Sequence, residues 1–108
     1  MANTFKNSIT GSIGVSNVIV YTVPAATSTT VIGMSIANVT ANNITISSTL
    51  TSGSSTVYLI KDATVMAGGT TVLVGGDQKV VLTATNYLTV VSSAATSADV
   101  VVSVLEIS

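Results

Sequence analysis

The amino-acid sequence predicts an all-β protein, an antiparallel β-sandwich of about eight strands with a jelly-roll or immunoglobulin-like topology. Short apolar runs recur at intervals of about 8 to 12 residues, separated by Ser, Thr, Asn and Gly, which is the spacing typical of sandwiches and barrels. Valine and threonine contribute 18 residues each, and both are β-branched residues that suit a pleated surface. No helical periodicity persists beyond a single turn, and no fixed-period repeat indicates a solenoid.

The N-terminal segment is the least regular part of the sequence. Apolar residues alternate only weakly over 6–15, where Gly11 and Gly14 interrupt them. We expect this segment to be an irregular edge strand or an arm that reaches a neighbour, since chain termini are often loosely held. The chain is therefore divided into an N-terminal arm or edge strand, residues 1–16, and a single β-sandwich domain, residues 17–108.

The strands of the sandwich domain follow from apolar alternation and from breaker residues. The first strand ends at Pro24, because proline cannot donate a hydrogen bond to a sheet. The second places Ile32, Met34 and Ile36 on one face, and Gly33 marks a bulge or a close approach of two backbones. The expected strands are 17–23, 30–38, 43–50, 56–61, 70–74, 79–84, 86–92 and 99–108.

The segment Gly75–Lys79 lies between two of these apolar runs. Its Gly-Gly-Asp sequence predicts a tight turn that joins 70–74 and 79–84 into a hairpin. These glycines do not form a phosphate-binding loop, because no Gly-Lys-Ser/Thr follows them and no helix begins there.

The last strand, 99–108, is apolar on both faces. Val100, Val102 and Val104 share one face, while Val101, Leu105 and Ile107 share the other with a serine. This pattern indicates a central strand or one that is clamped against a partner.

The composition favours an assembly subunit. Charged residues make up 6% of the chain, against about 25% in an ordinary domain. The net charge of −1 provides little repulsion between copies. Proline and lysine on edge strands prevent sandwiches from pairing edge to edge, and this chain has one proline and three lysines. We therefore expect an edge or a sheet face to be buried against another subunit.

The residues needed for most enzymatic chemistry are missing. The chain has no histidine for general acid–base catalysis, and no cysteine for nucleophilic attack or zinc binding. The carboxylates are interpreted as solvated residues at strand ends or turns, and they are not clustered as calcium ligands would be. They are Asp62, Asp77, Asp99 and Glu106. We therefore expect no catalytic residue, no cofactor and no metal site.

Other partners are also disfavoured. Three lysines and no arginine argue against nucleic-acid binding. The apolar runs are too short to cross a membrane, and the start has no signal-peptide core, which indicates a protein made and assembled in a cytoplasm. The tyrosines, Tyr21, Tyr58 and Tyr87, lie within alternating strands, so a core or interface position is favoured over an exposed sugar-binding platform.

The tip of the expected hairpin is the candidate subunit contact. Asp77, Gln78 and Lys79 place two of the seven charges of the chain on one turn. An exposed ion pair there contributes only about 0–1 kcal/mol, so it would select the register of a contact more than supply affinity.

Two segments resemble small structural proteins of tailed bacteriophages. The first is Tyr21–Ala25 followed by Thr30–Asn38, a strand, Val-Pro-Ala, a loop and a strand that ends in Asn. The second runs from Val74–Lys79 through Asn86–Val90 to Ser103–Glu106. Such proteins often carry more charge in these loops, and the resemblance transfers no functional residue to this chain.

The resemblance implies a non-enzymatic structural protein of a bacteriophage virion. We expect a capsid decoration (cement) subunit that assembles as a symmetric oligomer, with copies of itself and other virion proteins as partners. Its place is the virion, after assembly in the host cytoplasm. The alternatives are a neck, collar or tail subunit, or a receptor- or glycan-binding β-module that would expose its aromatic residues.

Overall fold

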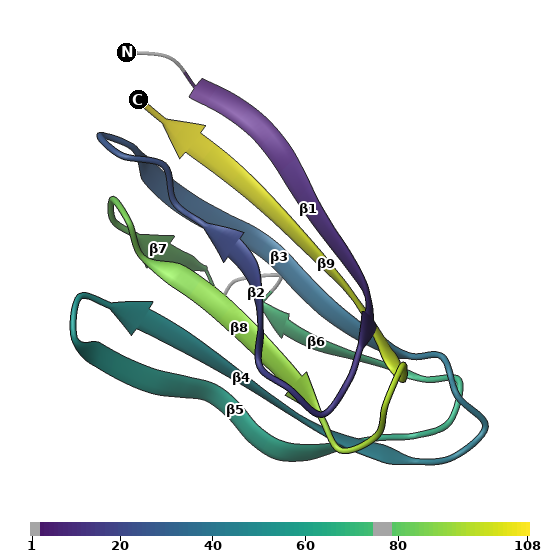
Figure 1. Ribbon diagram of the computed structural model, residues 1–108. Helices are drawn as coiled ribbons and strands as arrows, with labels where there is room; N and C mark the ends of the chain where they lie inside the picture. Colours follow the sequence, from purple (N-terminus) through teal and green to yellow (C-terminus); the bar gives the residue numbers. More distant parts are fainter. Residues whose placement is uncertain (1–2, 75–78) are drawn as a thin grey trace.

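The computed structural model describes residues 3–74 and 79–108, which form nine β-strands in two antiparallel sheets (Figure 1). The strands are β1 (Asn3–Ile13), β2 (Val18–Thr22), β3 (Ser28–Asn38), β4 (Ile44–Ser52), β5 (Ser55–Val65), β6 (Thr70–Val74), β7 (Val80–Leu82), β8 (Tyr87–Ser92) and β9 (Ala98–Ile107). The all-β sandwich is therefore confirmed. None of the described residues belongs to a helix long and apolar enough to cross a bilayer.

The order of the strands defines the topology. A five-stranded sheet has the order β1-β9-β3-β6, with β7 also paired to β3, and a four-stranded sheet has the order β2-β8-β4-β5. Successive strands cross from one sheet to the other except at β4–β5 and β6–β7. This interleaving of two antiparallel sheets is that of a jelly roll rather than of an immunoglobulin domain, whose sheets pair different strands.

The predicted hairpin around Gly75–Lys79 is wrong. Both β6 and β7 pair antiparallel with β3, β6 opposite Met34–Ala37 and β7 opposite Thr29–Val31. The two short strands therefore run in the same direction, one after the other, along the same edge of β3 (Figure 1). Residues 75–78 lie outside the described residues.

A bulge in β3 exchanges two side chains between faces. The pairing of β3 with β9 shifts between Val31 and Gly33, as expected from the glycine. Val31 is consequently buried beside Met34, while Ile32 turns to the outer side with partial exposure, contrary to the predicted alternation. The central position expected for the last strand is confirmed, because β9 lies between β1 and β3.

The core lies between the two sheets and is almost wholly aliphatic. Its largest fully buried side chains come from both layers, and full burial of each contributes about 1.5–3 kcal/mol. They include Ile13, Met34, Ile36, Val100 and Val102 on the five-stranded side, and Ile46, Leu88 and Val90 on the four-stranded side.

Thr85, in the turn between β7 and β8, has a left-handed backbone with φ of 70°. This conformation is unfavourable for a β-branched residue and is better tolerated by asparagine. Thr85→Asn is therefore expected to stabilise the protein by about 0.5–1 kcal/mol, measured by urea unfolding. Thr83→Asn, at an exposed position of the same turn, is the control and should bring no gain.

Candidate interaction surface

The side of the five-stranded sheet that points away from the core carries two cross-strand rows of side chains. In the first row, Phe5 lies opposite Leu105, Leu105 opposite Thr30, and Thr30 opposite Val81. In the second row, the successive neighbours are Ile9, Val101, Ser35 and Val72. We call this surface, with the row between them, the outer face.

The row between them is formed by small or neutral residues. It consists of Asn7, Ser103 and Gly33. The outer face thus has two apolar rows that flank a lower strip, and none of its residues is charged. Exposure of large apolar side chains is pronounced at both edges, where Phe5 is 75% exposed and Val81 is 67% exposed. Such contiguous apolar exposure is typical of an interaction surface.

Strand β1 shows the reverse of the pattern expected for the edge of an isolated sandwich. Its inward positions before the bulge at its end are all polar: Thr4, Lys6, Ser8 and Thr10. Only Ile13, past that bulge, enters the core. Its large apolar side chains, Phe5 and Ile9, point outward. Because residue parity decides which face of a strand is buried, this pattern favours burial of the outer side of β1 against something beyond the chain itself.

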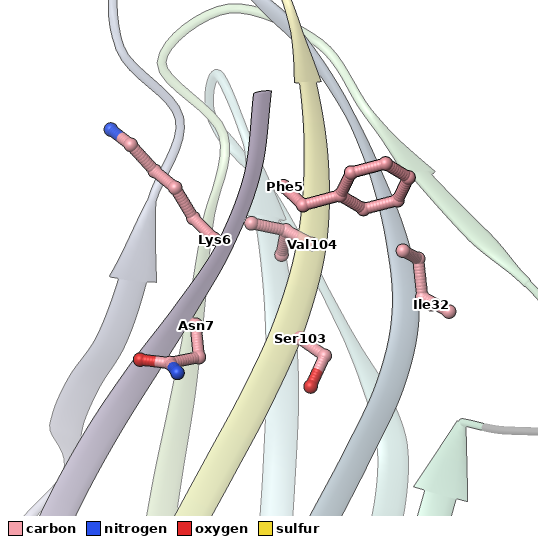
Figure 2. A pocket seen from close by; sticks show the side chains of 6 residues that line it. All are labelled: Phe5, Lys6, Asn7, Ile32, Ser103 and Val104. Carbon is pink, nitrogen blue, oxygen red and sulfur yellow. The ribbon is translucent and has the colours of Figure 1, made fainter. Parts of the chain in front are cut away.

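A shallow hollow of about 420 Å³ opens on the outer face. It is lined by Phe5, Lys6, Asn7, Ile32, Ser103 and Val104. Figure 2 shows the ring of Phe5 reaching across toward Ile32, while the amino group of Lys6 lies on the other side of β1. Phe5, Ile32 and Val104 form the apolar part of its lining, and Lys6, Asn7 and Ser103 form the polar part.

Behind this surface, the inward side of β1 contacts a buried polar cluster. The carboxylate of Glu106 in β9 is only 8% exposed. It accepts a hydrogen bond of 2.6 Å from the hydroxyl of Tyr21 and forms a 3.1 Å ion pair with Lys6. The Tyr21 hydroxyl also lies 2.9 Å from the hydroxyl of Thr29. The cluster thereby joins β1, β2, β3 and β9 across the two sheets.

The partners of Glu106 shift the titration of this cluster in opposite directions. The hydrogen bond from Tyr21, helped by Lys6, lowers the pKa of Glu106 below its ordinary value against the effect of burial. Burial, helped by the hydrogen bond to Glu106, raises the pKa of Tyr21 to about 12. The cluster is therefore an ionised carboxylate held by a neutral phenol and an ammonium.

No protein-family model matches the sequence, and neither does any curated protein. Two solved structures are similar in fold. One is a chain of the T13 viral particle of infectious bursal disease virus, with a TM-score of 0.58 and 11% identity over 96% of this chain and 30% of that one. The other comes from the Gx strain of infectious bursal disease virus, with a TM-score of 0.52 and 12% identity over 96% of this chain and 36% of that one.

The fold is shared with part of a viral chain. This protein spans about a third of the length of each of the two matched chains. At 11–12% identity the likeness concerns the β-sandwich, and every residue-level statement rests on the chain itself.

The structure places the carboxylates of the sequence analysis in different settings. The interpretation of Glu106 as a solvated residue is wrong, because β9 carries it inward. Asp99 is exposed and accepts a 3.1 Å hydrogen bond from the backbone of Ser12, and Asp62 is exposed in β5. Within residues 3–74 and 79–108, no three carboxylates gather into a group that could hold a metal ion.

The candidate contact at Asp77, Gln78 and Lys79 stays a prediction. Asp77 and Gln78 lie outside the described residues, and Lys79 is exposed just before β7. Of the tyrosines, Tyr21 is in the core as favoured, whereas Tyr58 is exposed on β5 beneath the amino group of Lys61, 5.2 Å from its ring centroid.

Tyr21→Phe tests the cluster, because it keeps the ring and removes the hydroxyl that Glu106 needs. We expect the free energy of unfolding to fall by about 1.5 kcal/mol, the lower end for a hydrogen bond to a charged group. Tyr58→Phe, at an exposed site, is the control and should stay within about 0.5 kcal/mol of wild type in urea unfolding.

Tyr21→Phe should also change how the stability of the protein depends on pH in the alkaline range. A tyrosine whose pKa is higher in the folded than in the unfolded protein stabilises the fold below pH 10.0, and this contribution disappears as the pH rises to about 12. The stability of the wild type should therefore fall over that interval more steeply than that of Tyr21→Phe. Parallel curves would contradict the buried position of the phenol.

Proposed function

We propose that this protein is a non-enzymatic structural subunit of a virus particle, which assembles through the outer face of its five-stranded sheet. The observation that carries the proposal is the uncharged, apolar outer face, together with the reversed pattern of β1. A chain that acts alone in solution gains nothing from Phe5 and Ile9 at these exposed positions.

The fold supports the viral setting. The β-sandwich matches part of a chain of an icosahedral viral particle over nearly the whole of this protein. A jelly roll has two broad sheet faces and long edges that neighbouring subunits can contact, and this fold occurs repeatedly in viral capsid domains. The Glu106 carboxylate and the hydroxyls of Tyr21 and Ser48 are engaged in hydrogen bonds inside the sandwich, which fits a structural role for these groups.

Within that class, we favour a capsid decoration subunit of a tailed bacteriophage, bound as a symmetric oligomer. A decoration subunit adds to a finished lattice through extended contacts, for which a rigid sandwich with one adhesive face is sufficient. A neck, collar or tail subunit is the second candidate, because it requires the same two features.

Imaging of particles made with and without the gene tests this proposal. Absence of density from the head surface of the deletion particles is the expected result. Absence from the neck or tail would replace the decoration role by the second candidate. Purified wild-type particles that lack the protein altogether would overturn the structural role.

A further inference from the structure

We infer that the partner of the outer face is the outer face of a second copy, so that two subunits pack sheet to sheet about a twofold axis. The inference deepens the proposed function and rests on it for its biological setting. The size, charge and relief of this surface each favour a second copy.

The whole outer side of the five-stranded sheet, with the outer face at its centre, is large enough for a stable dimer. Strands β1, β9 and β3 have 10 or 11 residues each, and β6 with 5 residues and β7 with 3 form the fourth position. At about 3.3 Å per residue and about 4.8 Å between strands, this side of the sheet covers about 630 Å². Two copies would then bury about 1,300 Å², above the roughly 1,000 Å² that a specific interface requires. A smaller partner segment would leave one of the two apolar rows in water.

The charge of the face favours a second copy over a charged partner. Two charged residues among those described lie at the margins of this face. Asp99 lies beyond the second row and accepts a hydrogen bond from the backbone of Ser12, and Lys79 is exposed two residues before Val81. The two rows and the strip between them are uncharged, so two identical faces meet there without like charges opposite each other. A charged partner surface would have to lose its hydration without gaining an ion pair.

The relief of the face is self-complementary. The strip of Asn7, Ser103 and Gly33 lies between two rows that project further, and the hollow beside Phe5 opens on this strip. An apolar row of one copy fits the strip of the other, as side chains of two packed sheets interdigitate. In an isologous contact, both copies make this fit at once.

The reversed pattern of β1 fits the same arrangement. In the dimer, Phe5 and Ile9 leave water, while Lys6 and Ser8 keep their partners Glu106 and the carbonyl of Val20 inside the subunit. Each face of β1 then lies in a suitable environment.

The test is the mass of the purified full-length protein by light scattering, with Val101→Lys at the centre of the second row. Val57→Lys is the matched control, since Val57 lies exposed on β5 in the other sheet and receives the same change. Wild type and Val57→Lys are expected to be dimers, and Val101→Lys a monomer. Circular dichroism and thermal unfolding of all three confirm that the fold is retained.

Several results would overturn the inference. A dimer that survives Val101→Lys in a folded protein, or that is lost in Val57→Lys, places the interface elsewhere. A wild-type trimer or larger ring excludes the twofold contact. A monomeric wild type that is nevertheless present on particles excludes self-pairing while the proposed virion role stands, so the two failures are distinguishable. Should Val101→Lys fail to fold, Val81→Lys at the exposed edge of the first row replaces it with the same expected loss of the dimer.

Discussion

Glu106→Ala is expected to lower the free energy of unfolding by about 2–4 kcal/mol, because it removes a buried acceptor on which two other side chains depend. The hydroxyl of Tyr21 loses its 2.6 Å hydrogen bond, and the ammonium of Lys6 loses its counter-ion. Lys6 is about half exposed, so water compensates part of its loss, while Tyr21 lies in the core. Urea unfolding measures the difference.

The control lies on the same strand. Asp99→Ala removes an exposed carboxylate of β9 whose partner is the backbone of Ser12, and it should cost less than about 1 kcal/mol. Equal losses in the two variants would show that the buried cluster contributes no more than an ordinary surface contact.

The pH dependence provides a second readout of Glu106. Its pKa is lower in the folded protein than in the unfolded chain, so its contribution is fully present above the ordinary value of 4.5. That contribution is lost as the pH falls below this value and through the lowered pKa of the folded state. Glu106→Gln, which does not titrate, should be less stable than wild type at pH 7 and should lose less stability on acidification. A variant with the acid profile of wild type would contradict this assignment.

Most strands could be predicted from the sequence, because alternation of Val, Ile and Thr reports burial locally. The strand at 99–108 is the clearest case, since valines on both sides indicated the central place that β9 occupies. The hairpin predicted at Gly75–Lys79 is wrong because local sequence does not determine which strands pair. A glycine-rich segment between two apolar runs is compatible with two strands that pair with each other, and also with two strands that follow one another along a third. Here both β6 and β7 pair with β3.

The surface and the cluster were only partly accessible from the sequence. Glu106 has the same parity along β9 as Val100, Val102 and Val104, and this parity indicates an inward position. The sequence offers few basic residues that could pair with a buried carboxylate, which made this position difficult to predict. Its partners Tyr21 and Lys6 are distant in the chain, so only the fold brings them together. Ile32 points outward because of the bulge in β3. The alternation of apolar residues in the sequence does not show at which residue the register shifts.

Asn38→Ala is expected to cost about 2–4 kcal/mol, since it removes four hydrogen bonds at a site that is 2% exposed. The Asn38 amide donates to the carbonyls of Asn42 and Val65, at 2.8 and 3.0 Å. Its oxygen accepts from the backbone and the hydroxyl of Thr40, at 2.9 and 2.7 Å. One side chain thereby fixes the β3–β4 connection and ties β3 to the end of β5 in the opposite sheet.

Asn38→Asp separates the donated from the accepted bonds. The carboxylate still accepts from Thr40, but it places negative charge against the carbonyls of Asn42 and Val65, so this variant should be at least as destabilised as Asn38→Ala at neutral pH. Asn42→Ala is the matched control, because Asn42 is exposed and contributes its backbone carbonyl, which alanine keeps. It should stay within about 0.5 kcal/mol of wild type. Wild-type stability of Asn38→Asp in urea unfolding would show that the link between the sheets does not depend on the amide.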